Sequence, residues 1–129
     1  MLKTEILNPH LNSLLSRVRH TNALVVADRG FPFWPGMEIV DLSLVDGIPT
    51  VLQVLAAVRR NFVIGQAFMA EEFFSNNAEE TQSALANVLE GIPITREPHV
   101  EFKKRVPSAI GLIRTGDATP YANIILVSA

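Results

Sequence analysis

Two ionisable residues flank a short apolar segment near the beginning of the sequence. The stretch HTNALVVADRGFP covers residues 20–32, and its centre, ALVVA, is apolar throughout, which is typical of a buried strand. His20 precedes this strand and Asp28 follows it. An imidazole and a carboxylate can together move protons near neutral pH, so the pair indicates acid/base chemistry.

The spacing of the two residues restricts how they can meet. A straight strand rises about 3.3 Å per residue, so about five residues keep its two ends well apart. Contact requires that His20, at the exit of a preceding helix, folds back over the edge of the sheet. In the alternative interpretation His20 is a polar residue at a helix end and Asp28 forms a turn. Spacing alone favours this second interpretation.

Three further residues have side chains suited to binding or proton transfer. His99 falls in the first turn of a predicted helix, where the helix dipole disfavours the imidazolium form, whereas His20 at a helix C-terminus has the opposite bias. Two such histidines can form an acid and a neutral donor. Tyr121 and Asn123, in TPYAN, offer a phenol and an amide that suit sugar hydroxyls. If a strand has already begun there, their side chains point the same way. Each of these residues is also ordinary on a protein surface.

Helices and apolar strands alternate along most of the chain. Asn8 is a good N-cap and Pro9 suits the first helical position, and this first helix is expected to end near His20. Asn77 and Glu80 form a capping-box-like pair before another helix. Helices are predicted over residues 8–20, 48–61, 77–91 and 98–106, and strands over 23–27, 38–44, 62–69, 93–98, 109–116 and 123–128. The order predicts an α/β fold, a single layered domain spanning 1–129 with a mixed sheet flanked by helices. Ligands of such folds tend to lie beyond the carboxyl ends of strands, where Asp28 falls.

The composition excludes several classes of function. Eleven basic and 13 acidic residues argue against a nucleic-acid partner, and the absence of cysteine excludes disulfides and thiolate metal sites. The chain has no signal-peptide pattern, no segment able to span a membrane, no Gly-rich phosphate loop and no cluster of metal ligands. We therefore expect a cytoplasmic protein without metal or cofactor. The mean hydropathy of +0.25 favours burial of apolar surface against another subunit.

The motifs together resemble one known family. LNPHLNSLLSRVRHTNALVVADRGFP, DLSLVDGIPTVLQVL, the histidine of HVEFK and IRTGDATPYANIIL match in order and spacing over essentially the whole chain. The sequence resembles the D-ribose pyranase and L-fucose mutarotase family, and GIPTVLQVL and PYANIIL are more similar to the ribose pyranase branch. Arg29 stands where a small residue, commonly alanine, is usual, and the loop FPFWPGME is more aromatic than typical.

The resemblance implies a function, a site and an assembly. It implies an isomerase that opens and recloses a sugar ring without a cofactor, with His20 catalytic and Asp28, His99, Tyr121 and Asn123 contacting the substrate. In this hypothesis Asp28 orients and charges His20. The resemblance also implies a homo-oligomer, typically a decamer of two stacked pentameric rings, with the pocket between subunits. An L-fucose-type mutarotase, a non-catalytic sugar-binding accessory protein of transport and a structural oligomer are the alternatives. The preferred sugar, octamer versus decamer, and the general base stay open.

Overall fold

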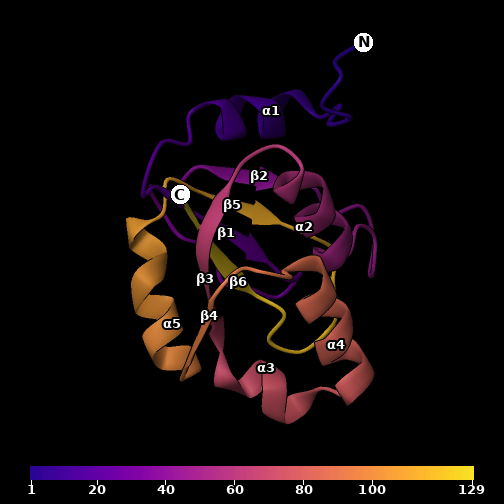
Figure 1. The fold of residues 1–129 in the computed structure, drawn as a ribbon, viewed down its shortest axis with the longest axis vertical. Helices are drawn as coiled ribbons and strands as arrows, with labels where there is room; N and C mark the ends of the chain where they lie inside the picture. The colour runs from indigo at the N-terminus through magenta and orange to yellow at the C-terminus, as the bar shows by residue number, and fades with distance from the viewer.

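The computed structural model describes residues 1–129 and places one six-stranded sheet between helices (Figure 1). The helices are α1 (Pro9–Ser16), α2 (Val51–Arg59), α3 (Glu71–Asn76), α4 (Glu79–Val88) and α5 (His99–Arg105), which continues into the 3-10 helix η1 (Val106–Ser108). The strands are β1 (Ala23–Ala27), β2 (Ile39–Asp41), β3 (Ile64–Ala70), β4 (Ile94–Glu97), β5 (Gly111–Arg114) and β6 (Ile124–Ser128). None of the helices has the length and apolar content needed to cross a bilayer.

The sheet is mixed because one strand runs against all the others. Its order is β2-β5-β1-β6-β3-β4, in which β1, β2 and β5 are parallel to one another and β3 is parallel to β4. Strand β6 pairs antiparallel with both β1 and β3. The carboxyl ends of the other five strands and the beginning of β6 therefore lie at the same edge of the sheet. The predicted α/β class with a mixed, helix-flanked sheet is confirmed.

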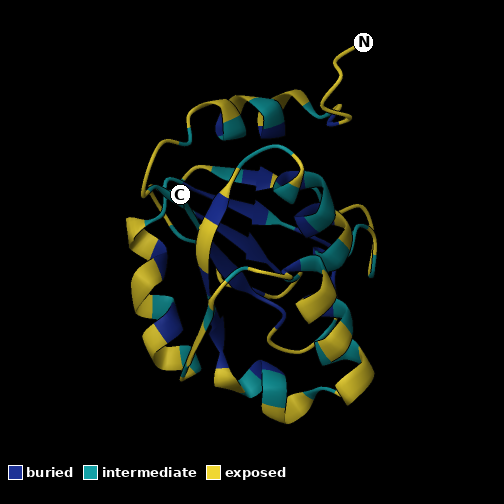
Figure 2. Ribbon diagram, viewed as in Figure 1, coloured by how far each residue is buried: buried dark blue, intermediate teal, exposed yellow.

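Alternate residues of the central strands point into two separate apolar cores. Leu24 and Val26 of β1 belong to the larger core, which α1, α2 and α4 cover, whereas Val25 and Ala27 belong to the smaller core beneath α5. Both faces of β1 are thus covered, which explains why its sequence is apolar throughout and not alternating. Figure 2 shows the result, with buried strands at the centre and exposed outer faces on the helices.

Side chains at the helix starts explain where two of the helices begin. Asn8 accepts a hydrogen bond from the backbone N–H of Leu11 at 2.9 Å, so the predicted cap of α1 is confirmed. At α2, Thr50 and Gln53 form a reciprocal capping box. The pair predicted at Asn77 and Glu80 is wrong, because Ala78 is the N-cap of α4 and no side chain caps it.

Other element boundaries also differ from those predicted; β2, for example, ends at Asp41 and not at residue 44. Helix α1 ends at Ser16 and not near His20, because the backbone N–H groups of Arg17 and Val18 already bond three residues back, to Leu14 and Leu15. The first two residues predicted for the third strand lie outside β3, which begins at Ile64. Helix α3 was not predicted, since its six residues are too few to show a helical period.

Candidate functional site

Asp28 and Asn123 form a hydrogen-bonded pair at the carboxyl edge of the sheet. Asp28 directly follows β1 and Asn123 directly precedes β6, so the antiparallel pairing of these strands brings together residues 95 positions apart. The backbone N–H of Asp28 donates to Oδ1 of Asn123 at 2.8 Å, and Nδ2 of Asn123 donates to Oδ2 of Asp28 at 3.1 Å. Asn123 is only 2% exposed, so its amide primarily fixes the carboxylate of Asp28.

The environment of Asp28 favours its protonated form. Burial raises the pKa of Asp28, and the nearby charge of Asp117 adds to this rise. Hydrogen bonds from the backbone of Gly30 and Phe31 and from Asn123 oppose it by stabilising the carboxylate. A half-buried carboxyl group with a raised pKa is suited to binding hydroxyl groups and to exchanging protons with them.

His99 packs among three aromatic rings beside this pair. Its imidazole stacks on Phe102 with ring centroids 6.0 Å apart, and it meets Phe31 and Tyr121 edge-on at 6.3 Å and 5.1 Å. Its Nδ1 atom is buried and has no hydrogen-bond partner within the chain. Burial first and the charge of Lys103 second lower the pKa of His99, against Glu72 and Asp28, which raise it. The sequence predicted that the surroundings of His99 disfavour the imidazolium form, and the lowered pKa agrees. The leading cause, however, is burial and not the helix dipole.

Tyr121 lies in a turn and not in a strand. Strand β6 begins only at Ile124, so the condition under which Tyr121 and Asn123 would share one side is not met. Tyr121 has a φ of 55°, in the left-handed region that few side chains adopt readily, and it is 37% exposed. Its ring meets that of His99 edge-on, and the residue is partly open to solvent.

His20 lies at the opposite edge of the sheet from the other four residues. It is exposed in the turn between α1 and β1, and the five residues of β1 separate it from Asp28 by roughly 17 Å at about 3.3 Å per residue. Because α1 ends at Ser16, the dipole of that helix does not act on His20 as expected. The expected contact between His20 and Asp28 is not formed within one chain.

Asp117, which no local pattern singled out, ties three segments of the site together. Its carboxylate accepts hydrogen bonds from the backbone N–H of Val51, at the start of α2, and of Thr119, both at 2.8 Å. Its carbonyl accepts from the backbone N–H of Arg29 at 2.9 Å. Asp117 thereby fixes the segments that carry Asp28 and Tyr121. Its place within RTGDATPYAN was the only signal available in the sequence.

Gly116 makes this arrangement possible by its lack of a side chain. A Cβ atom there would lie 2.5 Å from the carbonyl oxygen of Ile48 and as close to that of Val45. The backbone N–H of Gly116 donates to Pro49 at 2.9 Å, and its carbonyl accepts from Gly47 at 2.6 Å. The loop after β5 therefore packs directly on the loop before α2.

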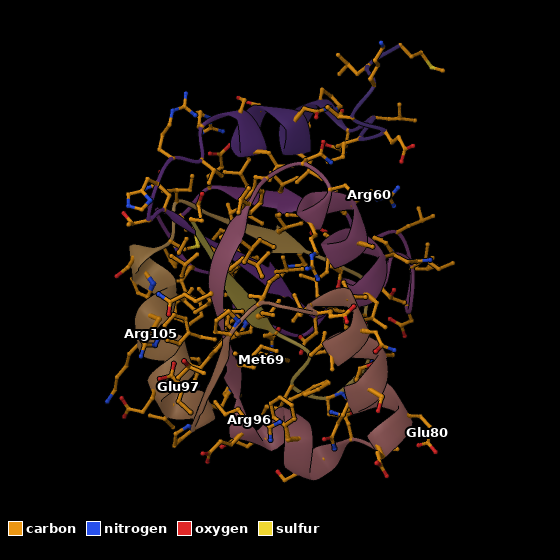
Figure 3. All side chains as sticks on the ribbon, viewed as in Figure 1. Arg60, Met69, Glu80, Arg96, Glu97 and Arg105 are labelled. Atoms are coloured by element: carbon orange, nitrogen blue, oxygen red, sulfur yellow. The ribbon has the colours of Figure 1, made fainter.

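A cavity elsewhere does not coincide with these residues. It measures about 390 Å³ and lies between α5 and the sheet, with Phe68, Glu97 and Arg105 among its lining residues. Glu97 and Arg105 point toward one another (Figure 3), and the guanidinium of Arg105 binds both carboxylate oxygens of Glu97, at 2.6 Å and 3.0 Å. This ion pair joins Arg105, the last residue of α5, to Glu97, the last residue of β4. No group of three or more His, Cys, Asp or Glu side chains is placed to hold a metal ion.

Comparisons with known proteins agree over the full length of the chain. The pattern of the family described as "RbsD / FucU transport protein family" matches residues 1–129. A D-ribose pyranase of Geobacillus kaustophilus is 44% identical over 99% of this chain and 93% of its own length. The structure of Bacillus subtilis RbsD complexed with D-ribose superposes with a TM-score of 0.93 at 36% identity, covering 100% of this chain and 98% of that one. The fucose mutarotase of Streptococcus pneumoniae, in complex with L-fucose, shares the fold at 20% identity and a TM-score of 0.82, over 99% and 98% of the two chains.

Proposed function

Because the chain belongs to the RbsD / FucU transport protein family, we propose that it is a cofactor-independent isomerase that interconverts pyranose and furanose forms, and anomers, of a monosaccharide. The resemblance seen in the sequence is thereby confirmed. The observation that carries the proposal is the full-length similarity to D-ribose pyranases and to a ribose-bound structure, which makes D-ribose the first candidate substrate. Residues 1–129 act as one domain in this proposal, and the protein works in the cytoplasm.

The reaction needs only proton transfers. One group donates a proton to the ring oxygen while another removes the proton of the anomeric hydroxyl, so the bond between the anomeric carbon and the ring oxygen breaks and a carbonyl forms. Closure through another hydroxyl changes the ring size, and closure on the other face changes the anomer. The proton count is unchanged, and positioned acid and base groups typically accelerate such steps by about 10²–10⁴-fold.

The four clustered residues supply the binding half of the site. Asp28, held by Asn123, accepts hydrogen bonds from sugar hydroxyls, and Tyr121 offers a phenol to another hydroxyl. His99, whose lowered pKa keeps it neutral at pH 7, takes the anomeric proton directly or through a water. These roles use groups that the fold already places at one edge of the sheet.

The acid, His20, comes from a neighbouring subunit. In each chain His20 lies at the edge opposite to Asp28, so a site that contains both requires the His20 edge of one chain to meet the Asp28 edge of another. Repeated head-to-tail contacts whose rotation closes form a ring, and we propose such a homo-oligomer here, a decamer of two pentameric rings. Large apolar side chains are exposed in the loops at the Asp28 edge, where Phe33, Leu44 and Ile48 are 71%, 76% and 53% exposed, and next to the strand starts at the other edge, where Val63 is 73% exposed.

The experiment that tests this function is NMR exchange spectroscopy on D-ribose and L-fucose with and without protein. We expect faster pyranose–furanose exchange of ribose with the wild-type protein and a loss of about 10²–10⁴-fold in His20→Ala. His10→Ala is the matched control, because it removes an exposed histidine of α1 that lies outside the site. Binding without faster exchange would instead identify a sugar-binding accessory protein, and acceleration for fucose alone would identify a mutarotase of the other branch.

A further inference from the structure

Helix α3 contacts the backbone next to both aromatic residues of the site. At its beginning, the carboxylate of Glu72 accepts a hydrogen bond from the backbone N–H of His99 at 2.8 Å. Directly after its end, Nδ2 of Asn77 donates to the carbonyl oxygen of Pro120 at 2.9 Å. His99 is 27 positions beyond Glu72, and Tyr121 is 44 positions beyond Asn77. The six-residue helix α3 and its C-cap residue Asn77 thus reach both parts of the site.

The bond from Asn77 acts on the backbone conformation of Tyr121. It holds the oxygen of the peptide group that joins Pro120 to Tyr121, while the next peptide group is held by a bond from the N–H of Ala122 to Thr119 at 3.3 Å. The φ and ψ of Tyr121 are the two rotations between these groups, and its φ of 55° is unfavourable for a residue with a side chain. Asn77 therefore helps to retain a conformation that the local sequence does not favour.

The bond from Glu72 acts on the first turn of α5. The first N–H groups of a helix have no partner within it, and Pro98, the N-cap residue of α5, offers no side-chain acceptor. The carboxylate of Glu72 takes the place of the missing cap at His99. It thus holds the backbone of the histidine whose ring meets Tyr121.

Helix α3 is itself firmly anchored. Phe73 is only 1% exposed in the larger core, and the guanidinium of Arg96 in β4 lies 3.6 Å from the ring centroid of Phe74. Figure 3 shows Arg96 beside α3. Asn77 also donates to the carbonyl oxygen of Phe73 at 2.8 Å, which holds its own amide in place. A displacement at either end of α3 is consequently resisted by the core.

We propose that α3 and Asn77 form a brace that sets the position of the His99 ring against the Tyr121 ring, with Glu72 and Asn77 as positioning residues. The two rings meet at 5.1 Å with an angle of 77° between their planes. The effect of this brace on sugar binding rests on the proposed function, whereas its effect on the geometry of the two rings does not. In this proposal neither positioning residue touches the substrate. Each acts by holding the backbone that carries, or adjoins, one of the two rings.

The ring geometry can be measured without any sugar, because Tyr121 is the only tyrosine of the chain. Selective labelling of tyrosine and histidine gives the ring signals of one tyrosine, and their nuclear Overhauser effect to the His99 imidazole reports the contact. We expect this effect to be lost or strongly weakened in Asn77→Asp, because a carboxylate oxygen would then face the carbonyl oxygen of Pro120. In Glu72→Gln we expect a smaller weakening, because the amide oxygen can still accept the hydrogen bond from His99.

The matched control is Gln82→Glu. Gln82 donates to the carbonyl oxygens of Phe74 and Asn77 at 2.8 Å and 2.9 Å, so it ties the same junction between α3 and α4 without reaching the turn before β6. Gln82→Glu should retain the contact of the rings. An unchanged effect in Asn77→Asp, or an equal loss in Gln82→Glu, would overturn the brace. If Asn77→Asp does not fold, Asn77→Ala is assessed by the same criteria.

Activity provides the second measurement. Misplacement by about 1 Å can cost on the order of 10²-fold, so we expect kcat/KM for ring exchange to fall by about tenfold or more in Asn77→Asp. In a Tyr121→Ala background the same substitution should add no further loss of activity, although its effect on Tm persists. Additive losses would show that Asn77 does not act through Tyr121 and would overturn its role in the brace. A wild-type protein that does not accelerate exchange would refute the proposed function and leave the test by NMR intact.

Discussion

Replacing Asn123 by leucine tests whether its amide exists to hold Asp28. The substitution keeps the volume of this buried side chain but removes both hydrogen bonds to Asp28, at 2.8 Å and 3.1 Å. A neutral hydrogen bond contributes about 1 kcal/mol net and one to a charged group about 1.5–3 kcal/mol, so the loss in unfolding free energy should be about 2–4 kcal/mol at neutral pH. For a chain of this length the corresponding fall in Tm is on the order of 10 °C.

The pH dependence of this loss in unfolding free energy distinguishes a lost hydrogen bond to Asp28 from poor packing of the leucine side chain. The pKa of Asp28 is raised in the folded state, so above the pKa of the unfolded chain the folded state binds more protons, and stability falls as pH rises through that window. Because the bond from Asn123 lowers this pKa, its removal raises the pKa further and extends the window upward. The loss caused by Asn123→Leu should therefore be smaller at about pH 4, near the ordinary carboxyl pKa, than at pH 7.

The assay is chemical unfolding of both proteins at one fixed protein concentration and at the two pH values, since assembly makes stability depend on concentration. Asn12→Leu is the control, because the amide of Asn12 donates to the neutral carbonyl oxygen of Ile6 at 2.7 Å. Its loss should be about 1 kcal/mol and the same at both pH values. An equal loss at both pH values for Asn123→Leu would refute the assignment of its amide to Asp28.

Four further results are expected. Inactive His20→Ala and Asn123→Ala proteins, mixed, dissociated and reassembled, should regain part of the activity if neighbouring subunits share a site; no recovery after verified subunit exchange would place the site within one chain. Gly116→Ala should cost about 1–3 kcal/mol in unfolding free energy, because its Cβ would overlap two carbonyl oxygens, and wild-type stability would contradict that packing. Lys103→Gln should raise the pKa of His99 in an NMR titration, because the charge of Lys103 lowers it; an unchanged or lower pKa would show that this charge does not act on His99. Light scattering should give a mass well above the 14.2 kDa of one chain, and a value near that mass would refute the shared site.

The sequence predicted elements whose local signals match their surroundings. The uninterrupted apolar run of β1 predicted a strand covered on both faces, and Asn8 with Pro9 placed the start of α1 correctly. At Asn77 the same kind of signal failed. Its amide is used by a distant carbonyl, that of Pro120, and Ala78 takes the capping position without a side-chain bond. The N-cap of α4 therefore depends on tertiary contacts, which a local sequence pattern does not reveal.

The sequence offered a set of candidate site residues but not their arrangement. The pairing of Asp28 with Asn123 depends on β6 running against its neighbours, and the apolar sequence of a strand is the same in either direction. The separation of His20 from Asp28 follows from the five extended residues of β1 that lie between them. Which chain supplies each half of the site is a property of assembly, which the sequence of one chain does not describe.

The position of His20 and Asp28 at opposite ends of β1 affects the activity expected of oligomers that mix wild-type and inactive variant chains. If each site takes one half from each of two neighbours, a chain that lacks both His20 and Asn123 disables two sites. In randomly mixed rings the remaining activity should then fall as the square of the fraction of intact chains, and not in proportion to it. A small admixture of such a chain would remove nearly twice its own share of activity, so a defective copy would act as a dominant inhibitor of its intact neighbours.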